Sequence, residues 1–99
     1  MNNSLTQNYD SAEFTLSTGN TDYDVRTQVA AFFNNIKVYR RVEIRTNVNI
    51  SIKLNKTTNP AITINFTDSP YTLDIIEVTN IYITNSSGST ASIKLIGTE

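Results

Sequence analysis

One unbroken alternation of apolar and polar residues constrains this chain more than any other feature. From Ile36 to Leu54, eight of the ten even positions are apolar, whereas Tyr39 is the one apolar residue at the odd positions. Side chains alternate between two faces along a β-strand, so a period of two predicts a sheet with one buried and one solvated face. The pattern therefore predicts a β-fold, and it names no reaction.

The alternating run is too long to form a single straight strand. Its 19 residues would extend over roughly 60 Å, whereas a domain of this size has a radius of gyration of about 13 Å. Thr46 is the polar interruption on the inner face, and the neighbouring Asn47 favours a turn. We predict two strands, at about 36–45 and 48–54, whose even-numbered residues line the core. Arg40 is charged at an inner position, so we expect the pattern to fail there.

The composition of the chain favours an all-β class. Ile, Val and Thr make up a third of the 99 residues, and β-branched side chains suit pleated, half-buried surfaces. Leu is scarce, which argues against a helical domain. Further strand predictions fall at residues 13–17, 23–29, 62–66, 71–76, 77–84 and 91–95. Short strands separated by regular turns predict an antiparallel β-sandwich or jelly roll of seven to eight strands.

Three local predictions complete this outline. Residues 30–34 are expected to form a short turn of helix after the strand at 23–29. The sequence Asn-Ser-Ser-Gly-Ser at 85–89 predicts a hairpin between the strands on either side of it. Phe66 is expected on the inner face of its strand with Ile62 and Ile64, and Gly97 is expected to end the last strand.

The length of the chain predicts one domain. Residues 1–11 are polar and are expected to form an N-terminal arm, which only the domain or a neighbouring molecule would order. Residues 12–99 are expected to form the single sandwich domain. The first residues lack the basic start and apolar run of a secretory signal, and no segment reaches membrane-spanning length. We therefore expect a soluble chain with no membrane partner.

The charges of the chain do not predict a nucleic-acid partner. Eight basic and nine acidic residues give a net charge of −1, which is too balanced for a phosphate-binding footprint. The one basic cluster is Arg40, Arg41 and Arg45. On a strand, Glu43 shares a face with the last two and partly neutralises them. Arg40 points the other way, and we expect it to be an ordinary paired Arg at a sheet margin or a subunit contact.

The polar residues of the chain are mostly small and uncharged. Asn, Ser and Thr together number 37, against 17 charged residues. Such side chains hydrogen-bond well and lose little rotamer entropy on ordering, which suits close packing against other proteins. A gene of biased base composition would explain the same enrichment.

The sequence contains no predicted catalytic, cofactor-binding or metal-ligating residue. The absence of His and Cys removes the commonest general base, the usual nucleophilic triads and zinc–sulfur sites. The three glycines do not form a phosphate-binding arrangement. We therefore expect no enzyme activity and no cofactor.

The carboxylates and the tyrosines are the remaining candidates for a site. Asp22 and Asp24 lie two residues apart, and with a neighbouring acid they could bind Ca²⁺, although a solvated strand start explains them more simply. Asp68 and Asp74 could form a glycosidase pair, although a turn explains Asp68. Three tyrosines could stack on sugars or on a partner protein if they are exposed. These are Tyr39, Tyr71 and Tyr82.

The segment 42–97 resembles the small β-rich structural proteins of tailed-bacteriophage particles. The matching stretches are VEIRT (42–46), ISIKLN (50–55), AITI (61–64), SPYTL (69–73), EVTNIYITN (77–85) and SGSTASIK (87–94). An upstream element of such proteins is similar to YDV (23–25) with AAFF (30–33). The motifs are strand-and-turn phrases and carry over no catalytic residue.

The resemblance implies a structural protein of the virion. The leading hypothesis is a head decoration protein that binds the major capsid protein and copies of itself. The other possible location is the neck or tail of the particle, where the partner would be a tail protein. The contacts would add by avidity around a symmetric lattice. The alternative hypothesis is a carbohydrate-binding or adhesion β-sandwich, for example on a phage fibre.

Overall fold

The computed structural model describes residues 8–74 and 76–99. Within these residues the chain forms eight strands and two short helical turns, and the helix found there is confined to single turns. In chain order, the elements are β1 (Tyr9–Leu16), β2 (Asn20–Asp24), α1 (Val25–Gln28), β3 (Arg41–Thr46), β4 (Ile50–Leu54), β5 (Ile62–Ile64), η2 (Phe66–Asp68), β6 (Tyr71–Leu73), β7 (Ile81–Asn85) and β8 (Ala91–Thr98). The predicted all-β class is therefore confirmed.

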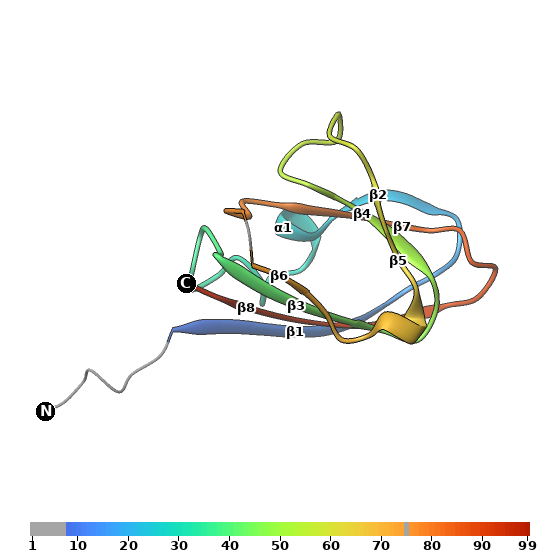
Figure 1. The fold of residues 1–99 in the computed structure, drawn as a ribbon, viewed down its shortest axis with the longest axis horizontal. Helices are drawn as coiled ribbons and strands as arrows, with labels where there is room; N and C mark the ends of the chain where they lie inside the picture. Colours follow the sequence, from blue (N-terminus) through green and yellow to red (C-terminus); the bar gives the residue numbers. More distant parts are fainter. Residues whose placement is uncertain (1–7, 75) are drawn as a thin grey trace, which may run out of the picture.

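The strands form two four-stranded antiparallel sheets that pack face to face (Figure 1). Sheet A has the order β1-β8-β3-β6, and sheet B has the order β2-β7-β4-β5. The pairing is nested: the first strand pairs with the last, the second with the seventh, the third with the sixth and the fourth with the fifth. The two ends of the folded chain therefore lie side by side in sheet A.

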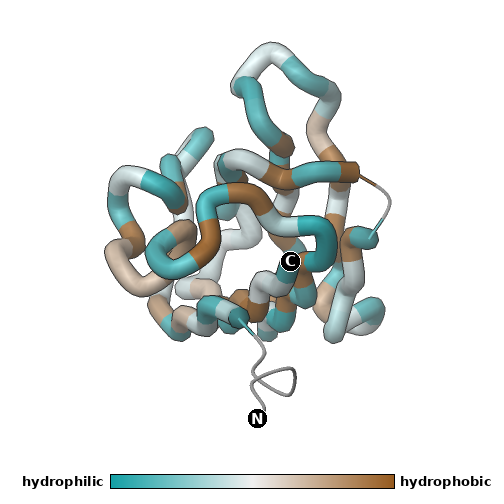
Figure 2. The backbone as a smooth tube through the Cα atoms, turned by 90° about the vertical axis from the view of Figure 1, so that its left-hand side faces the viewer, coloured by the Kyte–Doolittle hydropathy of each residue, from teal (hydrophilic) through white to brown (hydrophobic). Residues whose placement is uncertain are grey.

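Almost every connection passes from one sheet to the other. Of the strands that follow one another in sequence, β4 and β5 are neighbours in the same sheet, and their polar loop projects from the body (Figures 1 and 2). The predicted hairpin at 85–89 is wrong, because β7 belongs to sheet B and β8 to sheet A. The Asn-Ser-Ser-Gly-Ser turn reverses the chain as expected, but it does so between layers.

The long alternating run does break at Thr46. The run supplies β3 to sheet A and β4 to sheet B, and the even-numbered residues of both strands are buried. The predicted strand at 36–45 is too long, because residues 36–40 are irregular apart from one bridge between Tyr39 and Val78. Arg40 is exposed, so the prediction that the pattern fails there is confirmed.

Other boundaries also differ from the sequence predictions, and β6 (Tyr71–Leu73) and β7 (Ile81–Asn85) are shorter than the strands expected at 71–76 and 77–84. β2 ends at Asp24, and the helical turn follows at once in α1 rather than at 30–34. Asp24 explains this shift, because its carboxylate accepts a hydrogen bond from Thr27 N and so caps the helix. Phe66 is 52% exposed because it belongs to η2 and not to β5. Tyr9 to Ser11, at the end of the expected arm, pair with β8, while residues 1–7 lie outside the described residues.

The amide side chains mostly hold connections in place. Asn85 is fully buried, and its amide donates to Leu16 O and Ser89 O, which ties the ends of both sheets together. Asn55 accepts from Thr79 N and donates to Glu77 O. Much of the Asn content is therefore explained by backbone groups that would otherwise lack partners.

Gly97 does not end the last strand but leaves room for an aromatic ring. It is opposite Asp10 on one side and Val42 on the other, in the row that crosses sheet A. A Cβ at this position would lie 2.6 Å from two ring carbons of Tyr39. The Tyr39 ring packs flat against this part of the strand and contacts Phe32 and Phe33.

We predict that Gly97→Ala lowers the free energy of unfolding by about 1–3 kcal/mol, because the ring or the strand must shift. Urea denaturation measures this, with the exposed Ser92→Ala on the same strand as control. Combining Gly97→Ala with Tyr39→Ala should cost less than the sum of the two single changes. An additive cost would contradict this contact.

Candidate functional site

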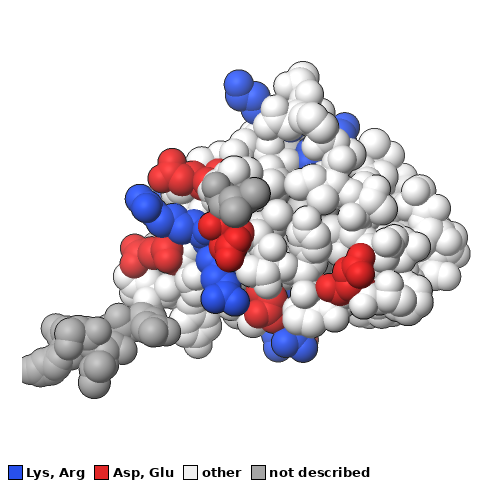
Figure 3. Space-filling view, viewed as in Figure 1, with Lys and Arg blue, Asp and Glu red and all other residues white. Residues whose placement is uncertain are grey.

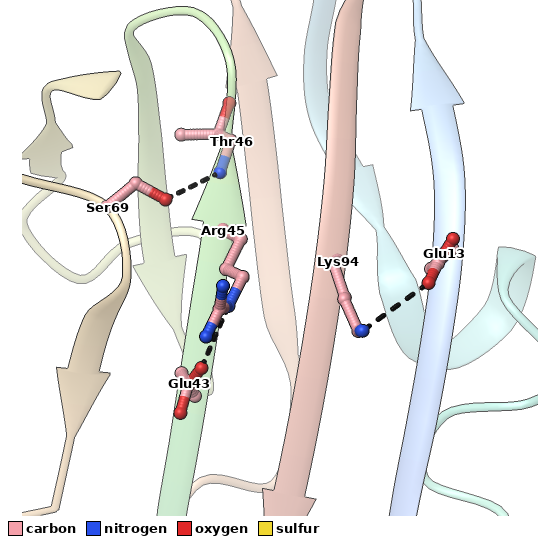
Figure 4. A network of polar contacts seen from close by, with 6 residues as sticks. All are labelled: Glu13, Glu43, Arg45, Thr46, Ser69 and Lys94. Atoms are coloured by element: carbon pink, nitrogen blue, oxygen red, sulfur yellow. Dashed lines mark hydrogen bonds and ion pairs between the residues drawn. The ribbon is translucent and has the colours of Figure 1, made fainter. Parts of the chain in front are cut away.

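The outer face of sheet A carries a groove. It has a volume of about 490 Å³ and is lined from β1, β3 and β8, with Asn47 and Ser69 closing one end. Figure 4 shows its polar side chains on the solvated face of the sheet. Figure 3 shows many of the charged side chains on the viewed face gathered toward the end of the molecule where β8 ends.

The groove contains a row of charges created by strand register. Glu13, Lys94 and Arg45 are directly opposite one another on β1, β8 and β3. Lys94 Nζ lies 3.5 Å from Glu13 Oε1, and Arg45 Nε donates to Glu43 Oε1 at 3.0 Å. The latter pair confirms the expected partner of Arg45. Two cations side by side repel, and each is offset by its own carboxylate.

These ion pairs contribute little to folding. The Arg45 and Lys94 side chains are 56% and 43% exposed, and exposed pairs contribute at most about 1 kcal/mol. Only the Nε atom of Arg45 has a hydrogen-bond partner among the described residues. Its terminal Nη groups can therefore donate bidentate hydrogen bonds to a carboxylate or another anionic group.

The end of the groove is fixed by polar contacts between segments. Ser69 Oγ accepts from Thr46 N at 3.2 Å, and Asn47 Oδ1 accepts from Ser92 N at 2.7 Å. These bonds tie the β3–β4 turn to β8 and to the segment before β6. The groove can thus present fixed hydroxyl and amide groups beside its two cations, which suits the binding of polar or anionic groups on a partner surface.

A second polar centre lies inside the fold. The buried carboxylate of Asp10 accepts hydrogen bonds from Asn34 N, Asn35 N and Ile36 N, at 3.0–3.2 Å. Tyr39 Oη donates to Asp10 Oδ2 at 2.6 Å and accepts from Phe33 N at the same distance. We call these residues the Asp10 latch, since they join the long segment 29–40 to the first strand.

The surroundings of Asp10 determine its ionisation. Burial by itself would raise the pKa of this carboxyl group. The hydrogen bonds from Tyr39 and from the backbone N–H groups of residues 34–36 outweigh burial and hold the pKa below its ordinary value of 3.8. Burial and the adjacent Asp10 raise the pKa of Tyr39. Both pKa shifts therefore favour an ionised Asp10 that accepts a hydrogen bond from a neutral Tyr39.

The structure does not bring the three candidate tyrosines together. Tyr39 is fully buried, Tyr71 lies on β6 of sheet A, and Tyr82 lies on β7 of sheet B. They form no common stacking platform.

The candidate carboxylates also have separate structural roles. Asp22 pairs with Lys53 Nζ at 3.2 Å, whereas Asp24 caps α1 and accepts from Asn80 Nδ2. Asp74 lines a small surface groove with Arg40 and Glu77, to which Asp68 does not contribute. Within residues 8–74 and 76–99, no group of three or more acidic side chains could hold a metal ion. Arg40 pairs with Glu77 at 3.6 Å.

Sequence reasoning missed the Asp10 latch, although Asp10 and Tyr39 both interrupt the alternation of apolar and polar residues. Asp10 is charged at an inner position of β1, in line with the buried Ala12 and Leu16. Tyr39 is the single apolar residue at the odd positions of the long run. Two such exceptions are consistent with a buried pair. They lie far apart in the sequence, however, so the sequence alone does not indicate that they are in contact.

No protein-family model and no curated protein matches this chain. In the described part of the structure, no helix is long and apolar enough to cross a membrane.

We predict that Asp10→Asn lowers the free energy of unfolding at pH 7 by about 2–4 kcal/mol, because an amide cannot accept all four bonds. Since the folded pKa is depressed, the contribution of the carboxylate is complete above about pH 3.8 and is lost as pH falls through the folded pKa. Chemical denaturation between pH 7 and pH 3 should therefore show a flatter pH dependence for the variant. The exposed Asp74→Asn is the control, and an unchanged pH slope in Asp10→Asn would contradict the latch.

Proposed function

We propose that this chain is a non-enzymatic structural protein of a tailed-bacteriophage virion. Its role would be that of a head decoration protein, which stabilises the capsid by binding the major shell protein and copies of itself. The observation that carries this proposal is the resemblance of segment 42–97 to β-rich structural proteins of such particles. The groove on the outer face of sheet A supplies a surface for the binding.

The strand pairing supports the same proposal. We infer that the nested order, first strand with last and so inward, is the jelly-roll arrangement of a sandwich. Viral capsid domains use this architecture repeatedly, as do lectins and cupins. Because one fold serves many functions, the resemblance and the surface chemistry favour the virion among these uses.

The groove favours a protein partner over a sugar. Its cations, Arg45 and Lys94, lie on adjacent strands and can meet an acidic loop of the shell protein. A sugar site needs exposed aromatic rings on one face, whereas the three candidate tyrosines are buried or lie on different sheets. Repetition of a modest contact around a particle would give strong overall binding by avidity.

The proposal predicts that the protein sediments with purified virions in near-stoichiometric amounts relative to the shell protein. Quantitative mass spectrometry of gradient-purified particles measures this. Detection in infected-cell lysate without any in the particles would rule the virion role out.

The binding surface has its own test. Lys94→Glu should weaken binding of the purified protein to particles that lack it by about tenfold, since it turns one attraction into repulsion. Lys56→Glu is the matched control, because Lys56 is exposed on the loop between β4 and β5. Equal binding by both variants would exclude the groove as the contact.

A further inference from the structure

Sheet A ends in a strand edge that lacks the usual protection. β1 runs for eight residues in unbroken register with β8, and Figure 4 shows it as the outermost strand on its side. The edge strands β5 and β6 have three residues each. The edge strand β2 has a register shift, with Asp22 at a φ of 51°. Short strands and bulges prevent pairing between edges, and β1 has neither.

The backbone of β1 is available for pairing along its outer side. Among the described residues, the hydrogen bond that reaches this backbone from outside sheet A is Asn85 Nδ2 to Leu16 O. The inward charge of Asp10, which elsewhere can protect an edge, is already bonded to residues 34–36. A groove of about 440 Å³ runs beside residues 8–11, with Ala31, Asn34 and Asn35 along it.

We propose that the β1 edge binds the β1 edge of a second copy of this chain in antiparallel orientation. The two four-stranded sheets then become one continuous sheet of two copies. An isologous contact uses the same edge in both partners, so it closes at the dimer. The protected edges of β2, β5 and β6 stop further growth into a fibre.

The charges, together with the alternation of side chains between the two faces of the sheet, select one register. Paired residues must face the same side of the sheet, and a register that places Glu13 opposite Glu13 of the second copy sets like charges together. Centring the two-fold axis on Ala12 avoids this and keeps residues 9–15 paired. Ser11 is then opposite Glu13 of the second copy, and Tyr9 is opposite Thr15.

The same register gives a partner to an exposed aromatic side chain. Tyr9 is 57% exposed in the single chain, and an aromatic residue opposite a β-branched one is a favourable cross-strand pair. Phe14, which is half-buried, is then opposite Asp10 of the second copy, which lines a groove together with Ala31 of that copy. The contact therefore covers the open edge, the groove and Tyr9 together.

This inference deepens the proposed function by naming the contact between copies. The role of the dimer in a particle rests on that proposed function. Its test uses the purified full chain alone. A wild-type protein that remains monomeric but still binds particles would remove the β1 contact and leave the virion role standing. A protein that dimerises through β1 but is absent from particles would support the β1 contact and rule out the virion role.

Sedimentation equilibrium over a concentration series tests the dimer and its register. Ser11→Glu should raise the dissociation constant about tenfold, because symmetry creates two pairs of like charge with Glu13. Ser11→Lys at the same exposed position should leave the constant unchanged or lower it. Adding Glu13→Lys to Ser11→Glu should restore dimerisation, since the pairs again have opposite charges.

Two results would overturn the inference. One is a wild-type chain that is monomeric at every concentration reached. The other is a dimer whose dissociation constant is the same in Ser11→Glu and Ser11→Lys. Urea denaturation of each variant at low concentration confirms that the monomer is folded, since Ser11 is exposed and its replacement should change monomer stability little.

Discussion

The fold depends on a buried carboxylate at the start of the first described strand. Asp10 binds three consecutive backbone N–H groups and the hydroxyl of Tyr39. Those groups belong to residues 29–40, the stretch that carries the chain from sheet B back to sheet A with little regular structure of its own. A buried charge is costly unless it is fully hydrogen-bonded, and here the bonds it accepts also satisfy backbone groups that would otherwise lack partners.

The latch joins the elements that close the sandwich. Asp10 lies opposite Gly97 on β8, and Gly97 lies opposite Val42 on β3, so one row of residues crosses three strands of sheet A. The Tyr39 ring packs against this row at Gly97, and the bridge to Val78 holds its backbone. The nested pairing brings the first and last strands together, and the latch fixes the segment that covers that end of the core.

Local patterns in the sequence predict much of the sandwich. The alternation predicts which side chains of β3 and β4 are buried, and Thr46 marks where the chain passes between sheets. The pattern does not predict which strands become neighbours, so the turn at 85–89 resembles a hairpin although it crosses between layers. The groove depends on the same missing information, because Glu13, Lys94 and Arg45 meet only through the register of three distant strands. Residues 25–40 depart furthest from prediction, since long-range contacts to Asp10 and Asn80 decide their course.

Amide hydrogen exchange followed by NMR at neutral pH tests the latch most directly. The amides of Asn34, Asn35 and Ile36 donate to a buried carboxylate, so we expect them to exchange as slowly as amides in the middle of β8. Opening them requires breaking a structural unit rather than local fraying. Exchange as fast as that of the exposed Thr57 in the loop between β4 and β5 would contradict the account, because residues 34–36 would then not be held by Asp10.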